Sequence, residues 1–220
     1  MDYVFQFGTV WRDWRLLLAG FGLTMRLVTE SMVLGLGIGV FGAWAAAQGP
    51  RWLRWGFRVY IETIRNTPFL VQLLMIYLGL PELGIRLSPN GAALAALTVN
   101  FGAYAIEIVR AGIEAVPPGQ TEAGLALGLR PLQVFRLIML LPALRAVYPA
   151  LTSQFVLLML GSSVVSVIGA EDLTATANSI QARTFRTFET YFIVTGLYLA
   201  LSLGFRAVFA AVGRLLLGIR

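Results

Sequence analysis

The chain has 220 residues, of which 58% are hydrophobic and only 13% are charged, and its mean hydropathy is +0.77. A soluble domain carries about 25% charged residues, so this composition excludes an ordinary soluble domain and indicates a chain whose solvent is largely lipid. The formal net charge is +6. In a chain this apolar, basic residues are expected to flank membrane spans rather than to bind nucleic acid.

Three residue types are absent. There is no Cys and no His, and all 17 basic residues are Arg. Disulfides, thiolate catalysis and cysteine metal sites are therefore excluded, together with the usual general base and the commonest metal ligand. An orthodox Walker A loop needs a Lys, so we expect no ATP site and no cofactor in this chain. Any ATP and magnesium must be bound by a partner ATPase.

Five segments are long and apolar enough to span, since each crossing needs roughly 20 residues. They cover about 16–47, 59–80, 91–112, 147–168 and 191–212. Asn66-Thr67-Pro68 interrupts the second of them. The first has four glycines in its second half, which permit close helix packing: Gly35, Gly37, Gly39 and Gly42. The chain is thus predicted to be a single all-α integral membrane domain, residues 1–220.

The arginines orient these spans. One set of loops and the C-terminal tail contain Arg51, Arg54, Arg58, Arg110, Arg130, Arg136, Arg145, Arg214 and Arg220. The other side contains Arg12, Arg15, Arg86, Arg183 and Arg186, offset by Asp13, Glu82, Glu171, Asp172 and Glu189. Because cytoplasmic loops are enriched in basic residues, we expect the N-terminus outside and the C-terminus in the cytoplasm. Met1-Asp2-Tyr3 lacks a positively charged start, so a cleaved signal peptide is not expected.

A proline-bounded loop of about 117–136 separates the third and fourth spans. Pro117 and Pro118 end the preceding helix. Gln120 or Thr121 is expected to begin a short new helix with Glu122 in its first turn, and Gly128 suits its C-terminal end. A helix of about two turns is marginal alone and needs a docking surface.

Glu122-Ala123-Gly124, followed by Gly128, Ile138 and a Leu-Pro pair, resembles the EAA loop of ABC importer permeases. The wider chain is similar to the polar amino acid branch of that family. The matching segments are 65–72 (RNTPFLVQ), 79–81 (GLP), 100–104 (NFGAY), 107–113 (EIVRAGI) and 166–169 (SVIG). The loop departs from the family at Gly124, where Ala is usual, and at Pro142, which falls one position late.

The resemblance implies a type I ABC importer permease fold in a bacterial cytoplasmic membrane. The coupling residues would be Thr121, Glu122, Ala123, Gly124 and Gly128, docked in a groove of a dimeric ATPase. Further partners would be a second permease subunit, identical or homologous, and a periplasmic or extracellular amino acid binding protein. The implied mechanism is alternating access, in which ATP binding in the partner reorients a cavity.

Three pairs of opposite charges lie in or near the spans, namely Arg26 with Glu30, Glu62 with Arg65, and Glu107 with Arg110. Their spacing of three or four puts each pair on one helix face. Charges in lipid are costly, so the pairs should face protein or a water-filled path. Simple neutralisation within each helix explains them equally well.

Asn100, Tyr104 and Glu107 fall on one stripe of the third span, which could line a cavity for a zwitterionic solute or bond to another helix. Ser162 and Ser163 replace part of a Lys-Asp-Thr-Ser-Leu run that the family often has there, and could equally be packing residues. With Glu30, these residues form our hypothesis for the translocation path.

The missing Asp of that run removes a partner for a cationic side chain, and residues 184–189 (TFRTFE) are similar to acidic amino acid permeases. Both features favour glutamate or aspartate as the solute. A self-contained channel or secondary carrier is the alternative, but it leaves the loop helix without a purpose. An intramembrane enzyme is a weaker one, because no paired carboxylates stand out.

Overall fold

The structure, a computed structural model, describes residues 3–218, and over these it is helical with no strand. Met1, Asp2, Ile219 and Arg220 lie outside the described residues, and so do the expectations placed on them. The elements are α1 (Phe7–Trp11), α2 (Trp14–Gln48), α3 (Arg51–Arg65), α4 (Phe69–Leu74), π-helix η1 (Met75–Gly79), 3-10 helix η2 (Leu80–Leu83), α5 (Pro89–Glu114), α6 (Pro118–Ala126), α7 (Pro131–Val134), π-helix η3 (Phe135–Met139), α8 (Leu140–Gly161), 3-10 helix η4 (Ser162–Ile168), α9 (Leu173–Thr184) and α10 (Thr187–Leu217).

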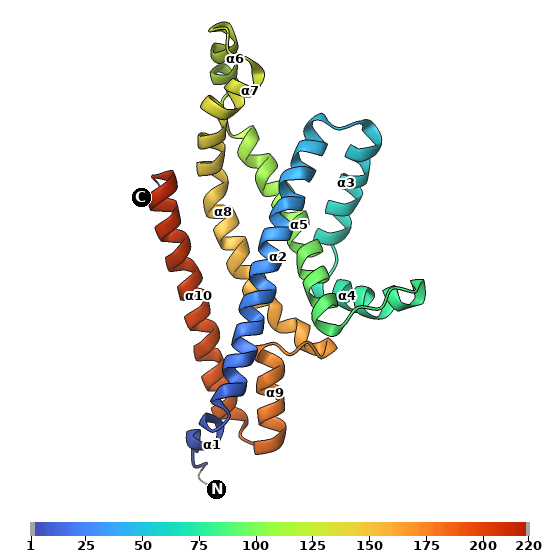
Figure 1. The fold of residues 1–220 in the computed structure, drawn as a ribbon, viewed down its shortest axis with the longest axis vertical. Coiled ribbons are helices and arrows are strands. Elements are labelled where there is room, and N and C mark those ends of the chain that lie inside the picture. The colour runs from blue at the N-terminus through green and yellow to red at the C-terminus, as the bar shows by residue number, and fades with distance from the viewer. Residues whose placement is uncertain (1–2, 219–220) are drawn as a thin grey trace.

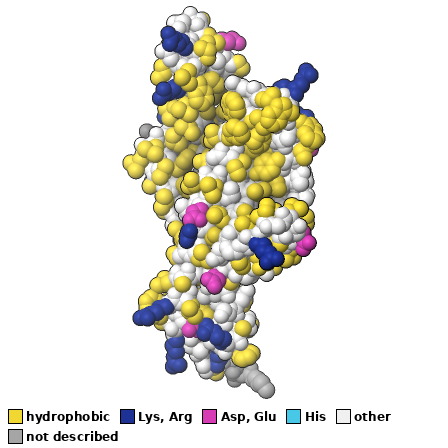
Figure 2. Space-filling model, turned by 45° about the vertical axis from the view of Figure 1, so that its right-hand side comes forward, with side chains coloured by type: hydrophobic (Ala, Val, Ile, Leu, Met, Phe, Trp, Pro, Cys, Tyr) yellow, Lys and Arg dark blue, Asp and Glu magenta, His cyan; other side chains and the backbone are white. Residues whose placement is uncertain are grey.

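Four helical stretches of the described chain are long and apolar enough to cross a membrane. They are Trp14–Gln48, Pro89–Glu114, Pro131–Ile168 and Thr187–Leu217, and each contains one of the expected spans. Figure 1 shows them along the long axis, with α6 at one end and α1 and α9 at the other. In Figure 2, hydrophobic side chains cover much of one face, and several Arg side chains gather toward its two ends. The sidedness of the termini stays a prediction.

The expected second span, 59–80, differs from the structure. Helix α3 ends at Arg65, α4 begins at Phe69, and the chain then tightens into η1 and η2. Pro68 causes the interruption, because it has no N–H and pushes the residue before it out of the helical region. Figure 1 shows α4 directed away from the long axis, whereas α3 lies alongside α2. Two shorter helical pieces that meet at a break therefore take the place of the expected second span.

Among the described elements, helices α2 and α5 form the most extensive contact, and it is a close one. A Cβ added at Gly35 would lie 2.5 Å from Cδ1 of Phe101, and one added at Gly39 would lie 2.6 Å from Cβ of Ala105. The two backbones approach so closely only because small residues face each other there. Gly37, expected to help, instead faces open space.

Two buried carboxylates fix the end of the molecule opposite α6. Asp172 begins α9, and its Oδ1 accepts a hydrogen bond from the N–H of Ala175 at 2.8 Å, a helix cap. Glu189, fully buried at the start of α10, accepts hydrogen bonds from the Tyr3 hydroxyl and from the Gln6 N–H. The N-terminal segment is thus fastened to α10.

Candidate functional site

The break between α3 and α4 creates a polar site beside the long apolar helix α5. In an unbroken helix the carbonyl of Ile64 would accept from the N–H of residue 68, but Pro68 has none. The side chain of Gln72 replaces that donor. Its Nε2 donates to the carbonyl of Ile64 at 2.7 Å and to that of Thr67 at 3.0 Å. One amide therefore satisfies the backbone that the proline leaves open.

Gln72 also joins the break to α5. Its Oε1 accepts a hydrogen bond from Nδ2 of Asn100 at 2.9 Å, while the residue itself is only 8% exposed. Buried polar groups are stable only when paired. The expected alternative for Asn100, a hydrogen bond between helices, is what the structure shows.

Further along α5, Tyr104 and Glu107 both contact Arg65. The guanidinium of Arg65 lies 5.6 Å from the centre of the Tyr104 ring, and its Nη1 lies 3.1 Å from Oε2 of Glu107. The ion pair is partly exposed, with 42% of the Arg65 side chain and 29% of the Glu107 side chain accessible. Asn100, Tyr104 and Glu107 therefore share a face, as predicted, and that face meets the end of α3.

Glu107 is shared between two guanidinium groups. Its Oε2 also lies 3.2 Å from Nη2 of Arg110, as the sequence predicted, and Arg110 continues to Glu114 at 2.8 Å. The predicted pair between Glu62 and Arg65 is wrong. Arg65 turns to Glu107 on α5, and Glu62 forms no ion pair within residues 3–218. Helical spacing made Glu62 a possible partner, but a second helix supplied a better one.

The other predicted path residues lie apart from this cluster or face their own helix. Glu30 pairs with Arg26 at 2.8 Å on α2, as predicted, with no hydrogen bond to the cluster. Ser162 is buried and donates to the carbonyl of Met159, while Ser163 donates to that of Leu160. Helix η4, which contains both serines, packs against α4 and α5. Their hydroxyls nevertheless make no hydrogen bond to the Asn100 stripe.

Sequence analysis missed Gln72 and the role of Arg65 between helices. Both stood within the segment that carried the family resemblance, but neither was assigned to the path. A usable signal was present: a lone amide four residues after Pro68 in an apolar stretch is placed to reach the carbonyls that the proline leaves unpaired.

At the far end of α5 the loop helix is α6. It begins at Pro118 with Pro117 as its N-cap residue, so neither Gln120 nor Thr121 begins it and Glu122 is not in its first turn. Proline is pre-organised for the first position of a helix, which explains the earlier start. Gly128 follows with φ of +80°, the left-handed conformation expected at this end.

The faces of α6 differ in their surroundings. Gly124 is buried against Val134 and Ile138, so α6 folds back on α7 and η3. Glu122 and Ala123 are exposed and Thr121 is half-buried. Leu127 is 82% exposed at the tip. Glu122, Ala123 and Leu127 therefore stay exposed while Gly124 packs inward.

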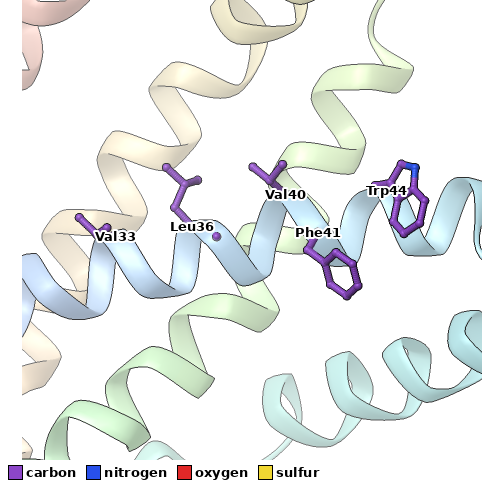
Figure 3. A pocket seen from close by; sticks show the side chains of 6 residues that line it. Val33, Leu36, Val40, Phe41 and Trp44 are labelled. Atoms are coloured by element: carbon purple, nitrogen blue, oxygen red, sulfur yellow. The ribbon is translucent and has the colours of Figure 1, made fainter.

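A hollow elsewhere in the described structure has a different chemistry. About 640 Å³ of open space lies along α2. Figure 3 shows its lining side chains projecting from this helix: Val33, Leu36, Val40, Phe41 and Trp44, with Gly37 between them. No charged group lines it, so it offers nothing to a polar solute, and the candidate site is the cluster at the α3–α4 break.

Four long apolar helices, a polar break beside one of them and an exposed helix at one end define a membrane transport subunit. Residues 38–217 match the family of binding-protein-dependent transport system inner membrane components, and the chain belongs to that family. The predicted recognition is confirmed.

Individual proteins agree with the family. The chain is 37% identical over 170 residues to the L-cystine transport system permease protein TcyB of Bacillus subtilis, covering 77% of this chain and 73% of that protein. It is 34% identical over 201 residues to the glutamine transport system permease protein GlnP of Escherichia coli, covering 90% and 92%. A crystal structure of an amino acid ABC transporter with histidines superposes with a TM-score of 0.89 at 35% identity, covering 96% of this chain and 99% of the other.

Proposed function

We propose that this subunit translocates a polar amino acid through the cluster at the α3–α4 break, driven by a separate ATPase that docks on α6. The observation that carries the proposal is the continuity of α5. One helix presents Asn100, Tyr104 and Glu107, and α6 begins four residues after its end at Glu114. A movement imposed on α6 therefore reaches the polar cluster through a single rigid element.

The cluster has the chemistry that a zwitterion needs. A guanidinium binds a carboxylate through two parallel hydrogen bonds, and Arg65 is accessible enough to do so. Glu107 accepts from an ammonium group, and because it is held by both Arg65 and Arg110 it can release one of them without losing all its partners. Asn100 and Gln72 supply neutral donors and acceptors beside these charges.

The solute class follows from the same groups. TcyB and GlnP are named for cystine and glutamine, both of which have an α-carboxylate and an α-ammonium group. Two arginines, Arg65 and Arg110, flank Glu107, and uncharged serines stand at 162 and 163. We extend the proposal to glutamate or aspartate as the preferred solute, because Glu107 is already paired with two arginines and is less able to hold a cationic side chain.

The assembly proposed around the chain contains two ATPase subunits, which bind ATP and Mg²⁺, and a second permease subunit. One chain provides too few spans to enclose a polar path by alternating access. An amino acid binding protein would deliver the solute on the face opposite α6, and the setting would be a bacterial cytoplasmic membrane. Family membership argues against a self-contained channel or carrier.

The docking of α6 is tested by Glu122→Arg in the reconstituted transporter. The variant should retain basal ATP hydrolysis by the ATPase and lose ATP-driven uptake, because a reversed charge at the exposed centre of α6 opposes docking. Glu82→Arg, which makes the same reversal on the exposed η2, is the control and should transport normally. Full uptake by Glu122→Arg would disprove the docking assignment.

The solute is tested by competition in the same vesicles with the cognate binding protein present. Glutamate or aspartate should displace labelled solute at lower concentration than glutamine, arginine or cystine. Stronger displacement by arginine would contradict the acidic preference but leave the amino acid assignment intact. Uptake without any ATPase would instead favour the secondary carrier.

A further inference from the structure

Helix α3 has a charged sector of which the proposed function uses only Arg65. Its charged residues recur at spacings of three and four along 15 residues: Arg51, Arg54, Arg58, Glu62 and Arg65. At 100° per residue these positions fall within about 80° of the helix circumference. All five are exposed, and only Arg65 forms an ion pair among the described residues.

The other sides of α3 are apolar and have separate roles. One side is half-buried toward α2 and α5 and consists of Leu53, Phe57, Tyr60, Ile61 and Ile64. The other contains Trp52, Trp55 and Val59, with Trp52 73% exposed. The charged sector lies between these two sides. Interfacial tryptophans mark the side that meets lipid, and the charged sector adjoins that side without overlapping it.

The contact between Arg65 and Glu107 fixes what the charged sector faces. Arg65 belongs to the sector and Glu107 belongs to the polar stripe of α5. Helices α3 and α5 run antiparallel (Figure 1), so Arg51 at the start of α3 lies toward the Glu114 end of α5. From Arg65 to Arg51 the sector therefore leads from the polar cluster toward the α6 end of the molecule.

Helix α3 packs against α2 and α5, two of the helices apolar enough to span, so its charged sector lies beside membrane spans. Fifteen residues extend about 22 Å, a large part of the roughly 30 Å hydrocarbon core. An Arg or Glu facing lipid at depth costs at least about 2.5 kcal/mol on insertion scales, and α3 is not among the helices apolar enough to span. Its charged sector must therefore face water or another polar surface.

We propose that the charged sector of α3 lines the aqueous route between the polar cluster and the α6 side, and that its arginines guide the carboxylate of the solute. Four Arg and one Glu make the route electropositive. A guanidinium group that remains solvated binds a carboxylate only weakly, so the carboxylate can leave again. This inference rests on the proposed transport of an amino acid and assigns a function to residues outside the cluster.

The absence of Cys from the chain permits a direct test in the assembled transporter. Single variants Arg54→Cys, Arg58→Cys and Glu62→Cys probe the sector, and Trp52→Cys and Val59→Cys are controls on the adjoining side of the same helix. In inside-out vesicles, a membrane-impermeant anionic methanethiosulfonate should modify the sector cysteines at least about tenfold faster than the controls, because a water-filled, positive route concentrates anions. Equal rates on both sides of α3 would overturn the inference.

Guidance by charge is tested by modification of Arg58→Cys. Uptake should fall in the variant, recover partly when a trimethylammonium-bearing reagent restores a positive charge, and fall further with a sulfonate reagent. Identical uptake after both reagents would disprove guidance. The labelling rates are measured from the mass that the reagent adds to the protein, and they do not depend on transport. Vesicles that label as expected but import no amino acid would therefore refute the proposed function alone.

Discussion

Gly124 and Ile138 are in such close contact that a Cβ at position 124 would lie 2.5 Å from Cδ1 of Ile138. The family usually has Ala at this motif position. In this chain the isoleucine from η3 occupies the space that an alanine methyl group would need. The glycine weakens α6 as a helix by up to about 1 kcal/mol, and its close packing on η3 offsets that loss.

We therefore expect Gly124→Ala to destabilise the loop, by about 1–3 kcal/mol for overpacking, although alanine is the better helix former. The double variant Gly124→Ala, Ile138→Val should regain most of the loss, because valine lacks the Cδ1 atom. Gly119→Ala is the matched control on the same helix, since nothing lies within 4 Å of its added methyl group. Thermal unfolding and ATPase co-purification measure the effect. A neutral Gly124→Ala would show that Ile138 moves aside freely.

The amide contact between Asn100 and Gln72 should link the break to α5 energetically. Asn100→Leu leaves Oε1 of Gln72 buried without a partner, which costs about 1–3 kcal/mol, and should reduce uptake. A double-mutant cycle with Gln72→Leu should give a coupling energy near 1 kcal/mol. Additive losses would mean that the two side chains act independently. Unchanged uptake in Asn100→Leu would remove Asn100 from the path.

The N-terminal attachment should depend more on Glu189 than on Tyr3. Tyr3→Phe removes one donor, but the N–H of Gln6 and the guanidinium of Arg186 still contact the carboxylate. Glu189→Ala removes all of these contacts. Limited proteolysis should therefore cleave the first residues readily in Glu189→Ala and slowly in Tyr3→Phe. Equal protection of both variants would show that the neighbouring aromatic contacts hold the segment without the carboxylate.

Burial raises the pKa of Asp172 above its usual value of 3.8. A carboxyl group whose pKa is raised in the folded protein stabilises the folded state while it is protonated, and this contribution is complete below the pKa that the group has in the unfolded chain. The contribution is lost as pH rises through the pKa that the group has in the folded protein. The stability of the unchanged protein, measured relative to that of Asp172→Asn, should therefore be lower at about pH 7 than at about pH 4. Thermal unfolding at both values measures the difference. Glu171→Gln, exposed and adjacent, should show no such trend.

Asp172→Ala distinguishes the helix-capping contribution of the Asp172 side chain from the effect of its charge. Loss of the hydrogen bond to the Ala175 N–H should cost about 0.5–2 kcal/mol at any pH, whereas Asn keeps an acceptor oxygen there. Equal stability of the Ala and Asn variants would exclude a capping contribution.

Much of the fold followed from composition and pattern. Apolar runs located the four long helices, Pro68 located the break, and Gly128 located the end of α6. These features depend on local physics: hydropathy over one crossing, the missing N–H of proline, and the positive φ that glycine adopts easily.

The errors arose where a second element decides the outcome. Glu62 was as well spaced for Arg65 as any helical neighbour, and only the approach of α5 makes Glu107 the partner. Ser162 and Ser163 suggested a lining, and in the structure their hydroxyls donate to the carbonyls of Met159 and Leu160, three residues earlier. Gln72 could have been found from its spacing to Pro68, but its contact with Asn100 depends on the direction that α4 takes after the break.

The close fit of α2 against α5 has a mechanical consequence. Where backbones touch at Gly35 and Gly39, neither helix can slide or rotate without first separating, so the two form one stiff strut. The α5 member of this strut is about 39 Å long. Near its far end, Oδ1 of Asn90 accepts a hydrogen bond from the N–H of Glu171, just before α9. The strut therefore connects the α6 end of the molecule with the α9 end (Figure 1), so that a tilt applied beside α6 would also displace the Asn90 contact near α9.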